Sequence, residues 1–283
     1  MCQQNKHTML TEFKNVSEIE NTFKTEQDCI KYLESKLWKN GQPTCPICGG
    51  HEHYVIKDGR YTCKKCRKHY NVKKNTIFDN SNLPLLTWFK AIKMCLNSKL
   101  GISSVKMAKN LNITQKTAWF TLMKIREALN VEIPQLNNVV EASVTEIKTQ
   151  YPHKNKNKEV ITLKIVGMVE RGSNTVLRKN TNTISIIEKH VNFNSIIITN
   201  KKPVFKNISL TYPEHEIVGF YPKNTLHLNN VRNRFSIVKK TIRRTHTFVS
   251  NKHLNRYCVE IGSKQNGSNM DLNKVLRFND LIR

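Results

Sequence analysis

Two cysteine pairs, Cys45–Cys48 and Cys63–Cys66, constrain this chain more than any other feature of its sequence. Two residues separate the cysteines of each pair, and fourteen residues separate the pairs. Four thiolates at this spacing suit a tetrahedral zinc ion, because each pair supplies two sulfurs from one tight turn. Two disulfides or four unrelated buried thiols are the alternatives, but disulfides need an oxidising compartment. The spacing predicts a structural zinc ribbon with Cys45, Cys48, Cys63 and Cys66 as ligands.

The stretch between the two pairs has the pattern of a hairpin. Tyr54–Ile56 and Arg60–Thr62 are strand-like runs, and Lys57-Asp58-Gly59 between them contains the strong Asp-Gly turn signal. His51, His53 and His69 lie nearby and could replace a cysteine as ligand. We expect them instead on the surface or facing DNA.

The charge of the chain favours a polyanionic partner. Its 283 residues contain 47 Lys and Arg against 21 Asp and Glu, which gives a formal charge of +26. Neutralising phosphates with such side chains releases condensed counterions, so double-stranded DNA is the expected partner. A membrane surface is the competing partner, but there is no apolar run of about 18 residues and no signal-peptide pattern. We expect a cytoplasmic protein, associated with the nucleoid if bacterial, without a membrane partner.

Composition and periodicity divide the chain into five stretches. Residues 1–24 are polar without a clear period, whereas a helical pattern starts near Glu26 and is stopped by Gly41 and Pro43. We expect a frayed end over 1–24, a helix and the zinc ribbon over 25–80, a DNA-binding helical region over 81–132, an α/β domain over 138–262 and a tail over 263–283.

The region around residue 110 has the pattern of a helix-turn-helix. A short helix from Ser103 or Ser104 carries Val105 and Ala108, and a second helix is capped by Thr114. In this motif the start of the second helix enters the major groove. The predicted DNA contacts there are Gln115, Lys116, Thr117 and Trp119. The alternative is an ordinary helical hairpin with a solvated basic face.

The second half of the chain changes to strand-like runs. We expect strands at Val139–Ile147, Val160–Glu170, Thr175–Arg178 and Ser195–Asn200, a helix at Thr183–His190 before the last strand, and a basic hairpin or loop at His153–Lys158. A later helix places Val231, Phe235, Val238 and Ile242 on one face. Its other faces are basic, and we expect Lys239, Lys240, Arg243 and Arg244 to contact DNA. Strands followed by helices in this order indicate an α/β domain.

The order of these parts resembles the small zinc-ribbon insertion-sequence transposases related to Merlin elements. The resemblance runs from about Glu26 to Gly262, and its most specific stretches are Val166–Gly172 and Val249–Tyr257. It implies a multi-domain α+β and α/β protein: an N-terminal zinc ribbon, a helix-turn-helix and a C-terminal RNase-H-like α/β domain. It also implies DNA strand transfer by two divalent metals held by Asp, Asp and Glu.

The chain departs from that family at all three acids. Ser143 and Asn200 stand at the two Asp positions, and Arg232 stands at the Glu position, although the neighbouring His227 and Asn229 match the family pattern. There is no Asp between Asp79 and Asp271. The resemblance therefore implies a catalytic site without its metal-binding carboxylates.

These observations lead to one main interpretation and three alternatives. The main one is a transposase-family DNA-binding protein without strand-transfer activity, which would be a repressor, a domesticated regulator or a relic, and which could form a homodimer. One alternative is an active transposase with a displaced carboxylate site at Glu141, which would use Mg²⁺ or Mn²⁺. The others are a zinc-ribbon transcription factor and a protein whose second-half histidines carry chemistry; we expect those histidines to be structural or to face phosphates.

Overall fold

The computed structural model describes residue 10 and residues 13–38, 41–56, 59–129, 135–150, 160–218, 226–246 and 248–266. These form two compact units: one contains the described residues up to 98 together with 104–129, and the other contains 99–103 together with 135–266. None of the helices in these ranges is long and apolar enough to cross a membrane. The predicted loop at His153–Lys158 and most of the predicted tail lie outside the described residues.

The first unit begins with two helices, α1 (Val16–Thr22) and α2 (Glu26–Leu37). The first corrects the expectation of a frayed end, because Asn15 caps it and Ile19 is fully buried. The second begins where the sequence indicated. Thr25 and Asp28 form a capping box, in which each side chain accepts a hydrogen bond from the other residue's backbone N–H.

The ribbon follows as a three-stranded antiparallel sheet in the order β1 (His53–Val55), β2 (Tyr61–Cys63), β3 (His69–Tyr70). The first two strands confirm the predicted hairpin, shifted by about one residue. The third strand was not predicted, because two residues carry no readable period. Lys57 and Asp58 of the predicted turn lie outside the described residues, whereas Gly59 has the positive φ of +79° that such a turn requires.

Three helices complete this unit: α3 (Leu85–Asn97), α4 (Ser104–Leu111) and α5 (Gln115–Ala128). Thr114 caps α5 as predicted, since its hydroxyl accepts a hydrogen bond from the Thr117 backbone N–H at 3.1 Å. The predicted short helix that carries Val105 and Ala108 is confirmed as α4; Ala108 is buried, whereas Val105 is 63% exposed. Met107 and Leu111 are the other residues that α4 buries.

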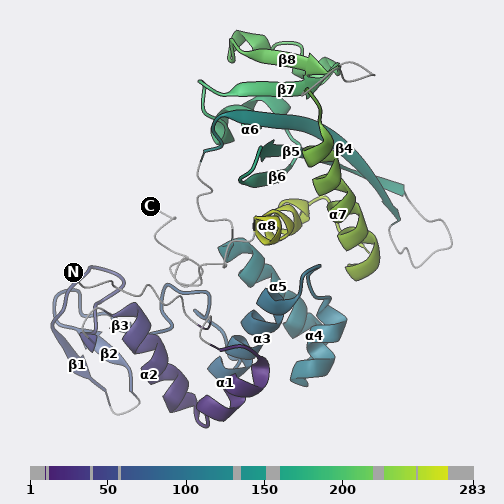
Figure 1. Cartoon of the computed structure of the whole chain (residues 1–283). Coiled ribbons are helices and arrows are strands. Elements are labelled where there is room, and N and C mark those ends of the chain that lie inside the picture. Colours follow the sequence, from purple (N-terminus) through teal and green to yellow (C-terminus); the bar gives the residue numbers. More distant parts are fainter. Residues whose placement is uncertain are drawn as a thin grey trace. The chain divides into compact units, whose positions relative to one another are not determined.

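The second unit is built on a five-stranded mixed sheet in the order β6-β5-β4-β7-β8 (Figure 1). The strands are β4 (Val139–Gln150), β5 (Val160–Glu170), β6 (Thr175–Lys179), β7 (Ile196–Asn200) and β8 (His215–Val218). Strands β4, β5 and β6 are antiparallel neighbours, whereas β7 runs parallel to both β4 and β8. The four predicted strands are confirmed; β8 was missed.

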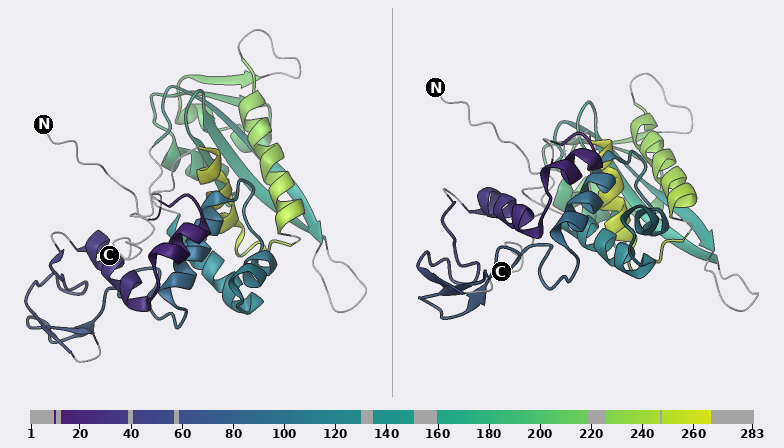
Figure 2. Two further views of the ribbon diagram at one scale, coloured as in Figure 1. Left: turned by 60° about the horizontal axis from the view of Figure 1, so that its bottom comes forward. Right: turned by 90° about the horizontal axis from the view of Figure 1, so that it is seen from below.

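Helices cover both faces of this sheet. The apolar core on one face includes Val140 and Met168 of the sheet and Ile187 of α6 (Thr183–His190). The other face carries α7 (Asn229–Thr245) and α8 (Leu254–Gln265). Figures 1 and 2 show α7 running across β4.

Gly167 of β5 explains how closely α7 approaches the sheet. A Cβ at this residue would lie 2.6 Å from Cε1 of Phe235, a distance that side-chain atoms do not tolerate. Only glycine therefore leaves room for the Phe235 ring here. The predicted buried face of α7 is confirmed, with Val231, Phe235, Val238 and Ile242 all buried.

Candidate metal centre and candidate nucleic-acid surfaces

The four cysteines of the two pairs converge on one point. One sulfur atom from each of Cys45, Cys48, Cys63 and Cys66 lies within 4.8 Å of all the others. The Sγ atoms of Cys45 and Cys66 are 3.7 Å apart, and those of Cys48 and Cys63 are 3.5 Å apart. A tetrahedron with Zn–S bonds of about 2.3 Å has edges of roughly 3.8 Å, so this donor set fits zinc.

Backbone geometry holds each cysteine pair in a tight turn. The N–H of Gly49 donates to the carbonyl of Cys45 at 2.9 Å, and the N–H of Arg67 donates to the carbonyl of Cys63 at 2.8 Å. Gly49 and Arg67 both adopt positive φ values, of 72° and 56°. Hydrogen bonds, first of all from the Cys66 backbone, lower the pKa of Cys63 to about 7, whereas burial and hydrogen bonds to the other three thiols raise the pKa of Cys48 to about 11.

The three nearby histidines place their Nδ1 atoms next to groups other than the cysteine sulfurs. Nδ1 of His51 lies 3.3 Å from the Thr44 hydroxyl, Nδ1 of His53 lies 2.9 Å from the His51 carbonyl, and Nδ1 of His69 lies 2.8 Å from the Thr62 hydroxyl. All three residues are half-buried or exposed. Among the described residues, the metal cluster consists of the four cysteines without a histidine.

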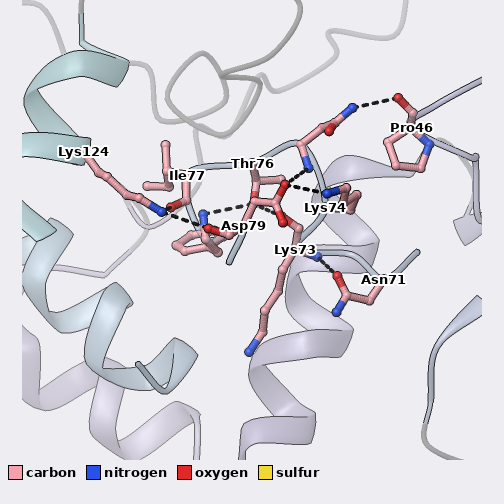
Figure 3. A network of polar contacts seen from close by, with 10 residues as sticks. Pro46, Asn71, Lys73, Lys74, Thr76, Ile77, Asp79 and Lys124 are labelled. Carbon is pink, nitrogen blue, oxygen red and sulfur yellow. Dashed lines mark hydrogen bonds and ion pairs between the residues drawn. The ribbon is translucent and has the colours of Figure 1, made fainter. Parts of the chain in front are cut away.

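A polar network connects the ribbon to α5 through the segment 71–80 (Figure 3). The Asn75 side chain donates to the Pro46 carbonyl inside the first cysteine pair at 2.8 Å. The Asp79 carboxylate pairs with Lys74 at 3.1 Å, and Lys124 of α5 donates to the Asp79 carbonyl at 2.9 Å. The segment therefore couples the position of the first cysteine turn to α5.

The first turn of α5 presents the predicted DNA contacts. Gln115 and Lys116 are exposed, whereas Thr117 and Trp119 are half-buried. Sequence reasoning missed Phe120, which is 53% exposed and packs edge-on against Trp119 with ring centroids 5.0 Å apart. An exposed aromatic ring four residues after the basic Lys116 on the same helix is suited to an interface. The helical period of the sequence alone could not predict that Phe120 is exposed.

Two of the three positions at which the resemblance led us to expect acids, Ser143 and Asn200, lie on adjacent strands. Glu141 of β4 pairs with Ile198 of β7, so Ser143 and Asn200, two residues further along each parallel strand, are neighbours on the same face. Ser143 is 6% exposed, and the Oδ1 atom of Asn200 is buried without a hydrogen-bond partner among the described residues. The structure thus brings these two residues together, with neither carrying a charge.

Glu141 is the nearest acid, and its carboxylate is fully occupied by other contacts. Its Oε2 accepts from the backbone N–H groups of Asn230 at 3.0 Å and Val231 at 3.2 Å. Its Oε1 accepts from the Asn230 side chain at 2.8 Å and from Nε of Arg171 at 3.2 Å, and lies 3.3 Å from Nδ1 of His227. The carboxylate therefore stabilises the start of α7, where the helix dipole favours negative charge.

Arg171 and Asn230 were missed from the sequence, although a signal existed. Glu141 lies in an apolar strand and is 0% exposed, and a buried carboxylate requires hydrogen-bonding partners. That rule says that partners exist, but it cannot identify them, because they lie 30 and 89 residues away in the chain.

The basic side chains of α7 have no acidic partners within the described residues. Arg232, Lys240, Arg243 and Arg244 are exposed and Lys239 is half-buried. The exposed Asn229 and the half-buried His227, which match the family pattern, lie at the start of the same helix. This surface therefore offers uncompensated positive charge to a polyanion.

Comparison with known proteins gives two family matches. A model described as "Transposase zinc-ribbon domain" matches residues 24–69, and one described as "ISXO2-like transposase domain" matches residues 137–266. The first spans the cysteine cluster and the second spans the five-stranded sheet with α7 and α8.

A related protein from Halobacterium salinarum is called "Uncharacterized protein in transposable element ISH50". It is 29% identical over 126 residues, which cover 42% of this chain and 41% of that protein. The match thus spans about two fifths of the length of the relative. The chain thus carries a transposase zinc-ribbon domain and an ISXO2-like transposase domain, and it resembles a protein of a transposable element.

Proposed function

We propose that this protein binds double-stranded DNA as a transposase relative and does not perform strand transfer. The main support for the proposal is that the Glu141 carboxylate is already hydrogen-bonded to other groups of the protein. The positions of the family acids hold Ser143, Asn200 and Arg232, and the one buried carboxylate beside them is occupied by the start of α7. Two Mg²⁺ ions need several free carboxylate oxygens, which these residues do not supply.

The proposed architecture assigns a role to each part. A structural zinc ion holds the ribbon, and α4 with α5 acts as a helix-turn-helix whose first recognition residues are Gln115, Lys116, Thr117 and Trp119. The three-residue connection between α4 and α5 and the cap at Thr114 support this assignment. The basic face of α7, with Lys239, Lys240, Arg243 and Arg244, would bind the DNA backbone.

We further propose that the sheet unit is RNase-H-like. Three antiparallel strands precede a helix, two parallel strands extend the same sheet, and the order β6-β5-β4-β7-β8 places the first strand in the centre. The apolar faces of this sheet do not require metal ligands for their packing. The domain can thus fold without the acids.

DNA binding is tested with zinc-loaded full-length protein and labelled duplexes from the flanks of its own gene. Affinity should fall steeply with salt, as expected when Lys and Arg neutralise phosphates. Lys116→Ala and Trp119→Ala should weaken binding to a specific flank more than to random duplex, while Lys31→Ala, on the exposed face of α2, serves as the control. Absence of any duplex binding at low salt would contradict the proposed function.

Repressor, regulator and relic are separated by the same assay. A specific complex on flank DNA supports a repressor or regulator, whereas equal binding to all duplexes supports a relic. Specific promoter binding by residues 25–132 alone, unchanged by deleting 139–262, would instead support a zinc-ribbon transcription factor.

A further inference from the structure

We propose that the polar site between β4 and β7 binds a DNA phosphate through side-chain cations, without a divalent metal. The β4–β7 polar site comprises Ser143, Asn200, Lys202 and Arg232. This inference rests on the proposed DNA-binding function and assigns a ligand to the site that lacks carboxylates.

The site contains two neutral side chains, and one of them, Asn200, has a buried oxygen without a hydrogen-bond partner among the described residues. This oxygen is Oδ1, and Ser143, on the neighbouring strand, is only 6% exposed. Buried polar groups without partners are rare, because each costs the free energy of its lost hydrogen bonds to water. An Asn amide can turn its NH₂ group to the same place, so the pair can donate to a ligand that carries acceptor oxygens.

Lys202 brings a positive charge to the edge of this pair. Its Nζ donates to the carbonyl of Val144 at 3.0 Å, which places the ammonium over β4, one residue beyond Ser143. An ammonium has three N–H donors, so two remain for another acceptor. Lys202 makes no ion pair with a described carboxylate, and the adjacent Lys201 is also exposed.

Arg232 lies on the flank of α7 that faces away from α8. The side chain of Gln265 in α8 donates to the carbonyl of Arg234 at 3.4 Å, and Thr241, seven residues after Arg234 and on the same flank, is buried. Arg232, Lys239 and Arg243 follow one another at spacings of seven and four residues, so they share the opposite flank. Since α8 packs against β6, at the edge of the sheet opposite β7 and β8, the flank of α7 that faces away from α8 lies on the side of β4 and β7.

Charge decides which ligand suits the site. With Asp, Asp and Glu the three family positions would carry a formal charge of −3; with Ser143, Asn200 and Arg232 they carry +1. The carboxylate of Glu141 is occupied, and Glu216, another acid on the same face, lies one strand further out on β8, where it pairs with Ile198. An ammonium and a guanidinium repel Mg²⁺ but bind a phosphodiester. The side-chain cations would thus take the place of the metal ions.

The test measures binding of a labelled duplex to zinc-loaded protein by fluorescence anisotropy, over a salt series, in chelator-free buffer without added divalent ions and in the same buffer with Ca²⁺, because a chelator would remove the structural zinc. Wild-type protein should bind equally in both. Lys202→Gln and Arg232→Gln should each weaken binding about fivefold at 0.1 M salt and lower the salt slope by about one. Lys189→Gln, an exposed residue of α6 on the other face of the sheet, should leave the affinity and the slope unchanged.

A reversed variant sharpens the test. Ser143→Asp/Asn200→Asp/Arg232→Glu should bind weakly without added divalent ions and regain affinity in Ca²⁺, because restored carboxylates can coordinate the cation. A circular-dichroism melt and the zinc content show that each variant is folded. The inference is overturned if zinc-loaded wild-type protein binds duplex only when Ca²⁺ is added, or if Lys202→Gln and Arg232→Gln behave as Lys189→Gln does. If wild-type protein binds no duplex at all, the proposed function fails as well.

Discussion

The cysteine cluster and the β4–β7 polar site differ in what their side chains contribute to folding. The ribbon is a sheet of short strands closed around four sulfurs, and in such modules the binding free energy of zinc is folding free energy. The polar site lies on a sheet whose two faces are covered by helices. Apolar burial therefore stabilises this sheet, whichever side chains occupy residues 143, 200 and 232. Ligands that hold a fold together cannot be exchanged, whereas ligands that serve only chemistry can.

The largest expected effect is the loss of a zinc ligand. Cys63→Ser should abolish stoichiometric zinc binding and unfold the ribbon, since structural zinc contributes about 10 kcal/mol or more in comparable modules. Zinc per chain by mass spectrometry and hydrogen exchange of the ribbon peptides measure the change. Cys95→Ser, at a buried cysteine outside the cluster, is the control and should keep one zinc per chain.

The next effect concerns Glu141 and separates a structural role from a catalytic one. Glu141→Ala should lower the free energy of unfolding of the sheet unit by about 3–5 kcal/mol, because Arg171 and the start of α7 lose a buried charged partner. Glu141→Gln should cost less, since its amide oxygen still accepts hydrogen bonds. Ser143→Ala should change stability little. A Glu141→Ala protein with the unfolding midpoint of the wild type in urea would contradict this role.

Gly167 provides a smaller effect that concerns packing alone. Gly167→Ala should destabilise the sheet unit by about 1–3 kcal/mol, because the new methyl group collides with the Phe235 ring. Phe235→Leu in the same chain should recover part of the loss. Urea unfolding of the single and double variants measures the loss of stability. Additive losses would argue against a contact between residue 167 and the Phe235 ring.

The smallest effect is a dependence on pH. Burial, together with the nearby Arg178 and Lys189, lowers the pKa of His190 to about 4 in the folded protein, against about 6.5 when unfolded. The unfolded chain therefore binds more protons between these values, so stability is complete above pH 6.5 and falls as the pH drops toward 4. Hydrogen exchange of β4 and β5 peptides should show this, with a shallower dependence in His190→Gln.

The fold could be predicted wherever a long apolar period exists. β4, β5 and α7 are read correctly because eleven to seventeen residues repeat one pattern. β8 was missed because it has four residues at the edge of the sheet, with Glu216 exposed and Ile217 55% exposed. α1 was missed because only one of its residues, Ile19, is buried.

The candidate sites follow the same division. The zinc ligands could be named because sequence spacing alone sets their geometry. The partners of Glu141 could not be named, because the sheet and α7 bring together residues that are far apart in sequence. Likewise, the contact of Lys202 with Val144 depends on the pairing of β4 and β7.

The central claim is that this transposase relative binds DNA but has lost strand transfer. The most direct measurement is a denaturing-gel nicking assay with zinc-loaded full-length protein, labelled duplex from the flanks of its gene, and Mg²⁺ or Mn²⁺. A parallel native gel reports binding. The account predicts intact DNA in both metals together with a retarded complex. Metal-dependent cleavage at a defined position that disappears in Glu141→Gln, with the variant shown to be folded, would contradict it.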